Sequence, residues 1–278
     1  MPTARDVRFA LNHMVAPQLG LADFFALAAA LGLHEVEIRN DIAGKPILDS
    51  TRPEAVKAAA GAADVTIVTI NALQRFNDWT NARESEAIAL ADYAQASGTR
   101  ALVLVPVNDG TGRADGERQR NARTALAALK PILADRGIGG LVEPLGFEIC
   151  SLRSKREAAE AIDAVNGHET FKLVHDTFHH FLAGEEAIVP NITGLVHISG
   201  VADMAVARAD VRDPHRVLVG PGDRLGNIAQ IKALLAGGYY GPFSFEPFAE
   251  ELRTLRDPAR AIGDSMNFIR AQLAAKAA

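Results

Sequence analysis

Four side chains that can bind a metal ion interrupt short apolar segments in the second half of the chain. The segments LVEPL, LVHDT, LVHIS and FSFEPF contain one each: Glu143, Asp176, His197 and Glu246. A carboxylate or imidazole within an apolar strand is costly unless something pairs with it. Carboxylates with one imidazole suit a divalent ion of intermediate hardness, such as Mn²⁺, Co²⁺, Mg²⁺ or Zn²⁺. We therefore expect one divalent ion, with coordination positions left open for substrate oxygens.

Eight short strand-like segments, separated by helical patterns, would have to position these side chains. The expected strands span residues 8–13, 35–40, 65–72, 101–107, 139–145, 171–177, 194–200 and 242–248. The expected helices span residues 22–32, 51–63, 83–98, 115–136, 154–166, 225–236 and 257–275, with a short sixth helix between His180 and Asn191. Regular alternation predicts a parallel sheet of βα units. Eight units favour a single (β/α)8 TIM barrel domain over residues 1–278, whereas an open doubly wound sheet would need a glycine-rich first turn.

In such a barrel the chemistry lies at the C-terminal ends of the strands. Adjacent strands are about 4.8 Å apart, so one ligand from each of the last four strands could meet at one ion. His13, Arg39 and Asn71 end the first three strands and are candidate substrate contacts. The connection over residues 201–224 is long and polar, which predicts an active-site loop.

Composition and charge limit the classes of partner. The net charge of −5 gives no basic footprint for nucleic acid or an anionic membrane surface. The single cysteine, Cys150, excludes an intrachain disulfide. The N-terminal residues show no export pattern, and no window has the length of a membrane span. We therefore expect a cytoplasmic protein that acts on a small molecule.

The four motifs resemble those of the xylose-isomerase-like barrel family of sugar isomerases and epimerases. LVEPLGF, VHDTFHH, LVHISG and FSFEPF stand where that family has its glutamate, aspartate, histidine and glutamate. The stretch RVLVGPGD, residues 216–223, resembles the family's arginine and glycines after the seventh strand. Within the family, EPLGF with CSLRS, and INALQRFNDW, are most similar to 2-keto-myo-inositol (inosose) isomerases.

The resemblance implies roles for individual residues. Glu143 and Glu246 would be both metal ligands and the acid/base pair, with His179 as a donor to a substrate oxygen. Arg216 would hold Glu143 or a substrate hydroxyl. One glutamate would remove a proton beside the ketone of a polyhydroxy ketone, giving an enediolate, and the other would return it. Return to the former carbonyl carbon is isomerisation, and return to the same carbon from the other face is epimerisation.

Several alternatives stay open from the sequence. A ketose 3-epimerase would use the same residues. A dehydratase of a cyclic keto acid such as 3-dehydroshikimate would need a positive clamp, for which Arg39, Arg75 and Arg153 are candidates. A repair nuclease on this barrel would need more histidines and a basic surface, and a sugar-binding protein would not need two inward glutamates. The Ala-rich C-terminal helix would allow a homodimer or homotetramer.

Overall fold

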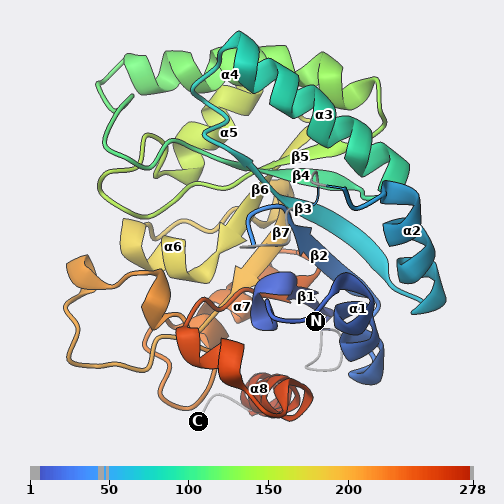
Figure 1. Ribbon diagram of the computed structural model, residues 1–278. Helices are drawn as coiled ribbons and strands as arrows, with labels where there is room; N and C mark the ends of the chain where they lie inside the picture. Colours follow the sequence, from blue (N-terminus) through green and yellow to red (C-terminus); the bar gives the residue numbers. More distant parts are fainter. Residues whose placement is uncertain (1–6, 43–46, 48–49, 276–278) are drawn as a thin grey trace.

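The computed structural model describes residues 7–42, 47 and 50–275, in which strands and helices alternate along the chain (Figure 1). The strands are β1 (Phe9–Asn12), β2 (Glu35–Arg39), β3 (Thr66–Gln74), β4 (Ala101–Val105), β5 (Gly139–Val142), β6 (Phe171–Asp176), β7 (Thr193–Ile198) and β8 (Phe243–Phe245). The helices are α1 (Leu21–Ala30), α2 (Pro53–Ala62), α3 (Asn81–Ser97), α4 (Glu117–Ala134), α5 (Lys155–Ala164), α6 (Thr177–Ala183), α7 (Asn227–Ala236) and α8 (Pro258–Ala274).

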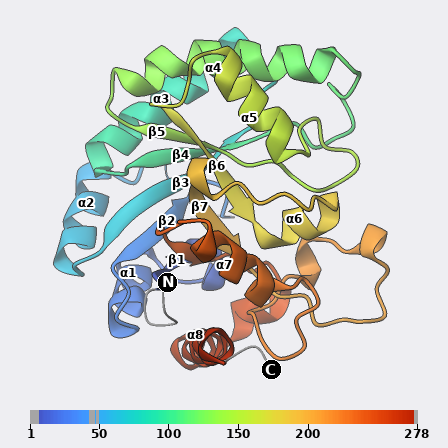
Figure 2. The same ribbon diagram turned by 180° about the vertical axis from the view of Figure 1, so that it is seen from behind.

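The strands form a closed parallel barrel. Each strand pairs with the next one along the chain, and β8 pairs with β1. The helices surround the barrel, as the two opposite views show (Figures 1 and 2). This confirms the predicted (β/α)8 TIM barrel.

Strand alternation separates an apolar plug inside the barrel from the larger core between strands and helices. The plug consists of Ala72, Ala101, Val103, Leu141, Val174 and Leu195. In three strands a predicted ligand follows a plug residue by two positions, which places it on the same inner face: Glu143 after Leu141, Asp176 after Val174, and His197 after Leu195. The polar cluster therefore lies at the end of a sealed barrel interior.

The sixth unit differs from the sequence-based expectation. The helix begins at Thr177, directly after β6, rather than beyond His180. Asp176 is its N-cap, because Asp176 Oδ1 accepts hydrogen bonds from the backbone N–H groups of Phe178 (2.7 Å) and His179 (3.2 Å). A carboxylate that satisfies the first amide groups lets a helix start at once. The predicted start of this helix was wrong because Asp176 was interpreted only as a metal ligand and not as an N-cap.

The long connection between β7 and α7 lies beside α6 in both views (Figures 1 and 2). It contains two short 3-10 turns, Arg208–Asp210 and Asp213–His215. Two backbone hydrogen bonds join the start of this connection to its later part. The N–H of Gly200 donates to the carbonyl oxygen of Val217 at 2.7 Å, and the N–H of Val217 donates to that of Gly200 at 2.8 Å. No helix within the described residues is both long enough and apolar enough to cross a membrane.

Candidate metal centre and active site

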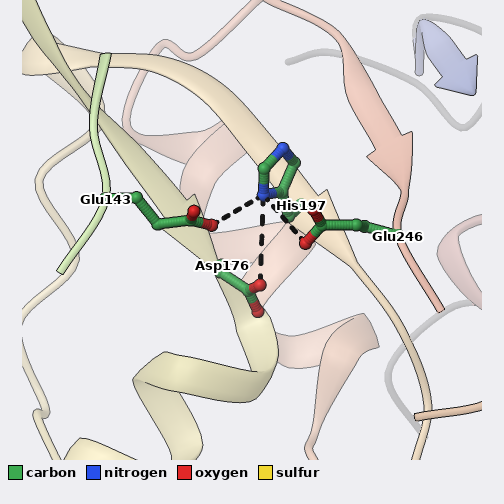
Figure 3. Close-up of side chains that lie close together, drawn as sticks. All are labelled: Glu143, Asp176, His197 and Glu246. Atoms are coloured by element: carbon green, nitrogen blue, oxygen red, sulfur yellow. Dashed lines mark hydrogen bonds and ion pairs between the residues drawn. The ribbon is translucent and has the colours of Figure 1, made fainter. Parts of the chain in front are cut away.

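Four side chains capable of binding a metal converge where β5 to β8 end. Glu143, Asp176, His197 and Glu246 are buried, and each offers one ligand atom within 4.8 Å of the others. Figure 3 shows the two glutamates on opposite sides of the His197 ring. His197 Nδ1 lies 2.7 Å from Glu143 Oε1, 3.2 Å from Glu246 Oε2 and 4.0 Å from Asp176 Oδ2. Ligands about 2.0–2.2 Å from one ion have separations of this size.

The two glutamates stand where their strands stop. The backbone N–H of Glu143 still donates to the neighbouring strand at 3.1 Å, and that of Glu246 does so at 2.9 Å. Pro144 and Pro247 come next, and proline has no N–H with which to continue a strand ladder. The chain therefore leaves the barrel just after each glutamate, which puts both carboxylates at the rim.

Asp176 and His197 are directly opposite each other in the register of β6 and β7. The two oxygens of Asp176 have different tasks. Oδ1 caps helix α6, while Oδ2 faces the site and accepts a hydrogen bond from Arg216 Nη2 at 2.8 Å. The cap fixes the carboxylate, so the oxygen that faces the other ligands is held in one orientation.

Glu37 on β2 contacts the far side of the His197 ring, and the sequence analysis missed it. Glu37 Oε2 lies 3.1 Å from His197 Nε2, and both side chains are completely buried. The same oxygen accepts hydrogen bonds from Thr69 Oγ1 (2.6 Å) and Asn71 Nδ2 (2.7 Å). If Nε2 carries the proton and donates it to Glu37, then Nδ1 has its lone pair directed at the ligand cluster.

Two buried arginines hold the carboxylates in place. Arg39 Nη1 donates to Glu246 Oε1 at 2.7 Å, and its other donors bind both oxygens of Asp41. Arg216 Nη2 donates to Glu246 Oε2 at 3.0 Å as well as to Asp176. The Arg216 guanidinium also lies against the rings of Phe178 and Phe248, 4.7 Å from each ring centre.

The charges of this cluster fit a divalent cation. Four buried carboxylates face two buried guanidinium groups: Glu37, Glu143, Asp176 and Glu246 against Arg39 and Arg216. Two negative charges are left when the imidazole is neutral, and uncompensated buried charge is costly. Oxygen donors with one nitrogen are also a set that Mn²⁺, Co²⁺, Mg²⁺ or Zn²⁺ accepts.

The two glutamates differ in their surroundings. Burial raises the pKa of Glu143, and the nearby carboxylates of Glu246 and Asp176 raise it further against the opposing effect of His197. Burial also acts to raise the pKa of Glu246, but His197, Arg216 and Arg39 outweigh it, so that pKa lies well below the usual range. For His197, burial acts to lower the pKa, and the surrounding carboxylates raise it well above the usual range.

A cavity of about 370 Å³ opens beside the cluster. Six of the predicted site residues line it: Arg39, Asn71, Glu143, His179, Arg216 and Glu246. The expected active-site loop reaches it through Asp213 and Arg216. His179 is buried against the edges of Phe147 and Phe178, and its Nδ1 has no hydrogen-bond partner among the described residues. Because the ring lines the cavity, His179 can bind a ligand oxygen there.

Two predicted substrate contacts lie elsewhere. His13 is not among the residues that line this cavity: its ring stacks on Phe24, and its Nε2 lies 3.0 Å from the carbonyl oxygen of Leu19. Arg153 lines a second, larger cavity of about 680 Å³ that shares three residues with the first. Their roles in substrate binding stay predictions.

Comparison with known proteins identifies the family. The family model described as xylose isomerase-like TIM barrel matches residues 25–272. A solved xylose isomerase domain containing protein from Salmonella typhimurium LT2 is 34% identical, with a TM-score of 0.88, over 95% of this chain and 97% of that one. This chain belongs to the xylose isomerase-like TIM barrel family.

More distant solved structures share the fold. The IOLI protein with a bound zinc atom is 19% identical over 95% of this chain and 98% of its own, with a TM-score of 0.84. An L-ribulose 3-epimerase is 17% identical over 96% of this chain and 94% of its own, with a TM-score of 0.71. A search of curated protein sequences found no match.

Proposed function

We propose that this chain is a divalent-metal-dependent isomerase that moves a carbonyl group along a polyhydroxy ketone, with 2-keto-myo-inositol as the first compound to test. One observation carries the proposal. Glu143 and Glu246 flank His197 and both line the same cavity. Membership of the xylose isomerase-like family supports it, and the zinc atom in the similar IOLI structure supports a metal.

The ligand cluster described above would hold the ion. When bound, the ion would polarise the substrate carbonyl and make the neighbouring C–H more acidic. Glu246 accepts hydrogen bonds from Asn12, Arg39 and Arg216, whereas the only side-chain hydrogen bond of Glu143 within the described residues is with His197. The freer carboxylate, Glu143, is therefore assigned the removal of the proton, and Glu246 its return.

Other residues of the cavity would bind and orient the substrate. His179 lines the cavity and could donate to a substrate oxygen, and Asn71, which is held by Glu37, lines the same cavity. Phe147 and Phe248 also line the cavity and would keep water from the reacting carbons. A cavity near the lower end of the usual 300–1,000 Å³ range suits one six-carbon sugar.

Among the described residues, the cavity beside the cluster offers no unpaired arginine as a clamp for the substrate of a dehydratase. Arg39 is occupied by Asp41 and Glu246. Arg75 is occupied by Asp78 and Asp109, at 3.0 and 2.5 Å. Two of the three arginines considered as a clamp for a ring carboxylate therefore already have carboxylate partners. The ketose 3-epimerase reaction needs the same glutamates and differs only in the carbon that receives the proton.

Proton exchange with solvent tests the proposal. The Mn²⁺-loaded protein is incubated in D₂O with 2-keto-myo-inositol and, separately, with a ketohexose, and NMR locates the deuterium and the ketone. We expect deuterium beside the carbonyl together with a shifted ketone. Inversion at the deuterated carbon without a shift would make the protein an epimerase, and loss of water would make it a dehydratase. Absence of metal-dependent exchange with every compound would overturn the proposal.

A further inference from the structure

The larger cavity of about 680 Å³ adjoins the metal cavity. Asn108, Phe147 and Asp213 line both, so the two spaces meet at these residues. The outer wall comes from the loop after β5, from the end of α6, and from the segment after β7, which lies beside α6 in both views (Figures 1 and 2). A six-carbon ring in the inner cavity would leave this outer cavity free for a further part of the ligand.

Three arginines line the outer cavity: Arg153 is half-buried, and Arg208 and Arg212 are exposed. Arg153, Arg208 and Arg212 form no ion pair within the part of the chain that the structure describes. The two acidic residues of this cavity are Glu148, which is exposed, and Asp213, which pairs with Arg216. The inner cavity differs, because each of its arginines has at least two carboxylate partners. A positive region in a chain with a net charge of −5 is a local feature rather than a general property.

The three guanidinium groups are held in place by uncharged partners. Arg153 donates twice to the carbonyl oxygen of Gly146, at 3.0 and 2.8 Å. Arg208 lies over the Phe181 ring at 4.9 Å. Arg212 lies over the Phe147 ring at 5.9 Å and donates to the carbonyl oxygens of residues 209 and 211. These contacts orient the groups without neutralising them, and preorganised donors lose less entropy on binding.

We propose that the outer cavity binds an anionic group, a phosphate or a carboxylate, carried by the polyhydroxy ketone at a distance from its reacting carbons. That the ligand is a polyhydroxy ketone depends on the proposed function. The anion site itself is inferred from the three arginines alone. Arginine binds both groups through paired hydrogen bonds, which makes it the residue suited to such a site. The natural substrate is then a sugar phosphate or sugar acid, for which neutral inosose is a smaller analogue.

A binding experiment tests the anion site without any turnover. Calorimetry on the Mn²⁺-loaded protein compares glycerol 3-phosphate and glycerate with glycerol, none of which has a ketone. We expect at least one anion to bind ten-fold or more tightly than glycerol, and the tighter one identifies the natural group. The double variant Arg208→Gln/Arg212→Gln should lose about ten-fold of that affinity, while Arg156→Gln, an exposed arginine paired with Glu160, should keep it.

Equal binding of glycerol and both anions would overturn the proposal. So would anion binding that the double variant leaves unchanged, because the anion would then sit on the metal.

Turnover is a second measurement, with D-fructose and D-fructose 6-phosphate as a matched pair. We expect the phosphate to have the higher kcat/KM and the double variant to reduce this preference about ten-fold through KM. If the anions bind but neither sugar exchanges a proton with solvent, the proposed reaction is rejected and the proposed anion site stands.

Discussion

The Nε2 atom of His197 lies 3.1 Å from Oε2 of Glu37, while Nδ1 of the same ring faces the three carboxylates of the candidate metal site. The ring thus connects a buried carboxylate on β2 with the three candidate metal-binding carboxylates. Burial acts to raise the pKa of Glu37, but the adjacent His197 lowers it by more, so this carboxyl stays ionised. Glu37 is therefore a positioning residue for the imidazole.

The variant Glu37→Gln tests this role. An amide can still approach Nε2 but no longer holds it with a negative charge, so the ring loses its fixed tautomer. We expect the affinity for Mn²⁺ to fall about 10–100-fold, as is usual when the partner of a ligating histidine is changed. Calorimetric titration of the metal measures it. Glu35→Gln is the control, since Glu35 lies on the same strand and pairs with Arg8 instead. Equal metal affinity in both variants would contradict the assignment.

Glu143→Gln and Glu246→Gln each remove a proposed proton-transfer group while keeping an oxygen that can bind metal. We expect kcat to fall about 10²–10⁴-fold in each variant at saturating metal. Glu169→Gln, at an exposed carboxylate, should leave kcat unchanged. Deuterium exchange on the best substrate measures the effect. Wild-type-like exchange in either glutamine variant would reject the assigned mechanism.

Arg216 should be as important for stability as for activity. Its side chain is 1% exposed and binds two buried carboxylates. Arg216→Gln leaves Asp176 without its guanidinium partner and Glu246 with Arg39 alone. Breaking a buried pair in this way costs about 3–5 kcal/mol of unfolding free energy. Urea denaturation in EDTA measures this cost. Arg260→Gln breaks a contact between mostly exposed side chains and should cost no more than about 1 kcal/mol. A similar small cost for both variants would show that Arg216 is not a structural cation.

His180 should make the fold sensitive to acid. Burial and the charge of Lys155, whose Nζ lies 2.8 Å from His180 Nδ1, lower the pKa of His180 to about 4. Arg208 also lowers it, Glu185 opposes the shift, and His175 packs against the ring. An unfolded histidine takes up its proton near pH 6.5. Between about pH 6.5 and 4 the unfolded chain therefore binds more protons, so the unfolding free energy falls as the pH falls.

The variant His180→Gln keeps a hydrogen-bond acceptor for Lys155 but cannot titrate. Urea denaturation at several values between pH 4.5 and 7.5 should therefore show a shallower loss of stability than in the wild type. His34→Gln changes a histidine whose ring is mostly exposed and should keep the wild-type slope. A slope unaffected by His180→Gln would mean that other groups cause the acid sensitivity.

The barrel and the four converging side chains could be predicted because each depends on a local pattern. Short apolar segments between helical patterns indicated the strands, and polar side chains interrupted those segments near the strand ends. Glu37 could not be recognised in the same way. The alternation Glu35, Glu37, Arg39 along β2 is typical of a strand with one solvated face, and only closure of the barrel turns that face inward.

The positions of His13 and Arg153 also depend on tertiary structure. His13 directly follows β1 and begins a 3-10 helix, and its ring packs on Phe24. Arg153 is directed by its hydrogen bonds to Gly146 toward the outer cavity. The position of a residue at the end of a strand predicts that it lies near the barrel mouth. It does not predict the direction in which the following loop turns its side chain.

A crystal soaked in Mn²⁺ and measured for anomalous scattering tests the central claim most directly. We predict one strong peak about 2.0–2.3 Å from ligand atoms of Glu143, Asp176, His197 and Glu246. An Asp176→Asn crystal, soaked in the same way, should show a weaker peak at that position. No peak among these four residues at saturating Mn²⁺, or a peak only elsewhere, would contradict the account.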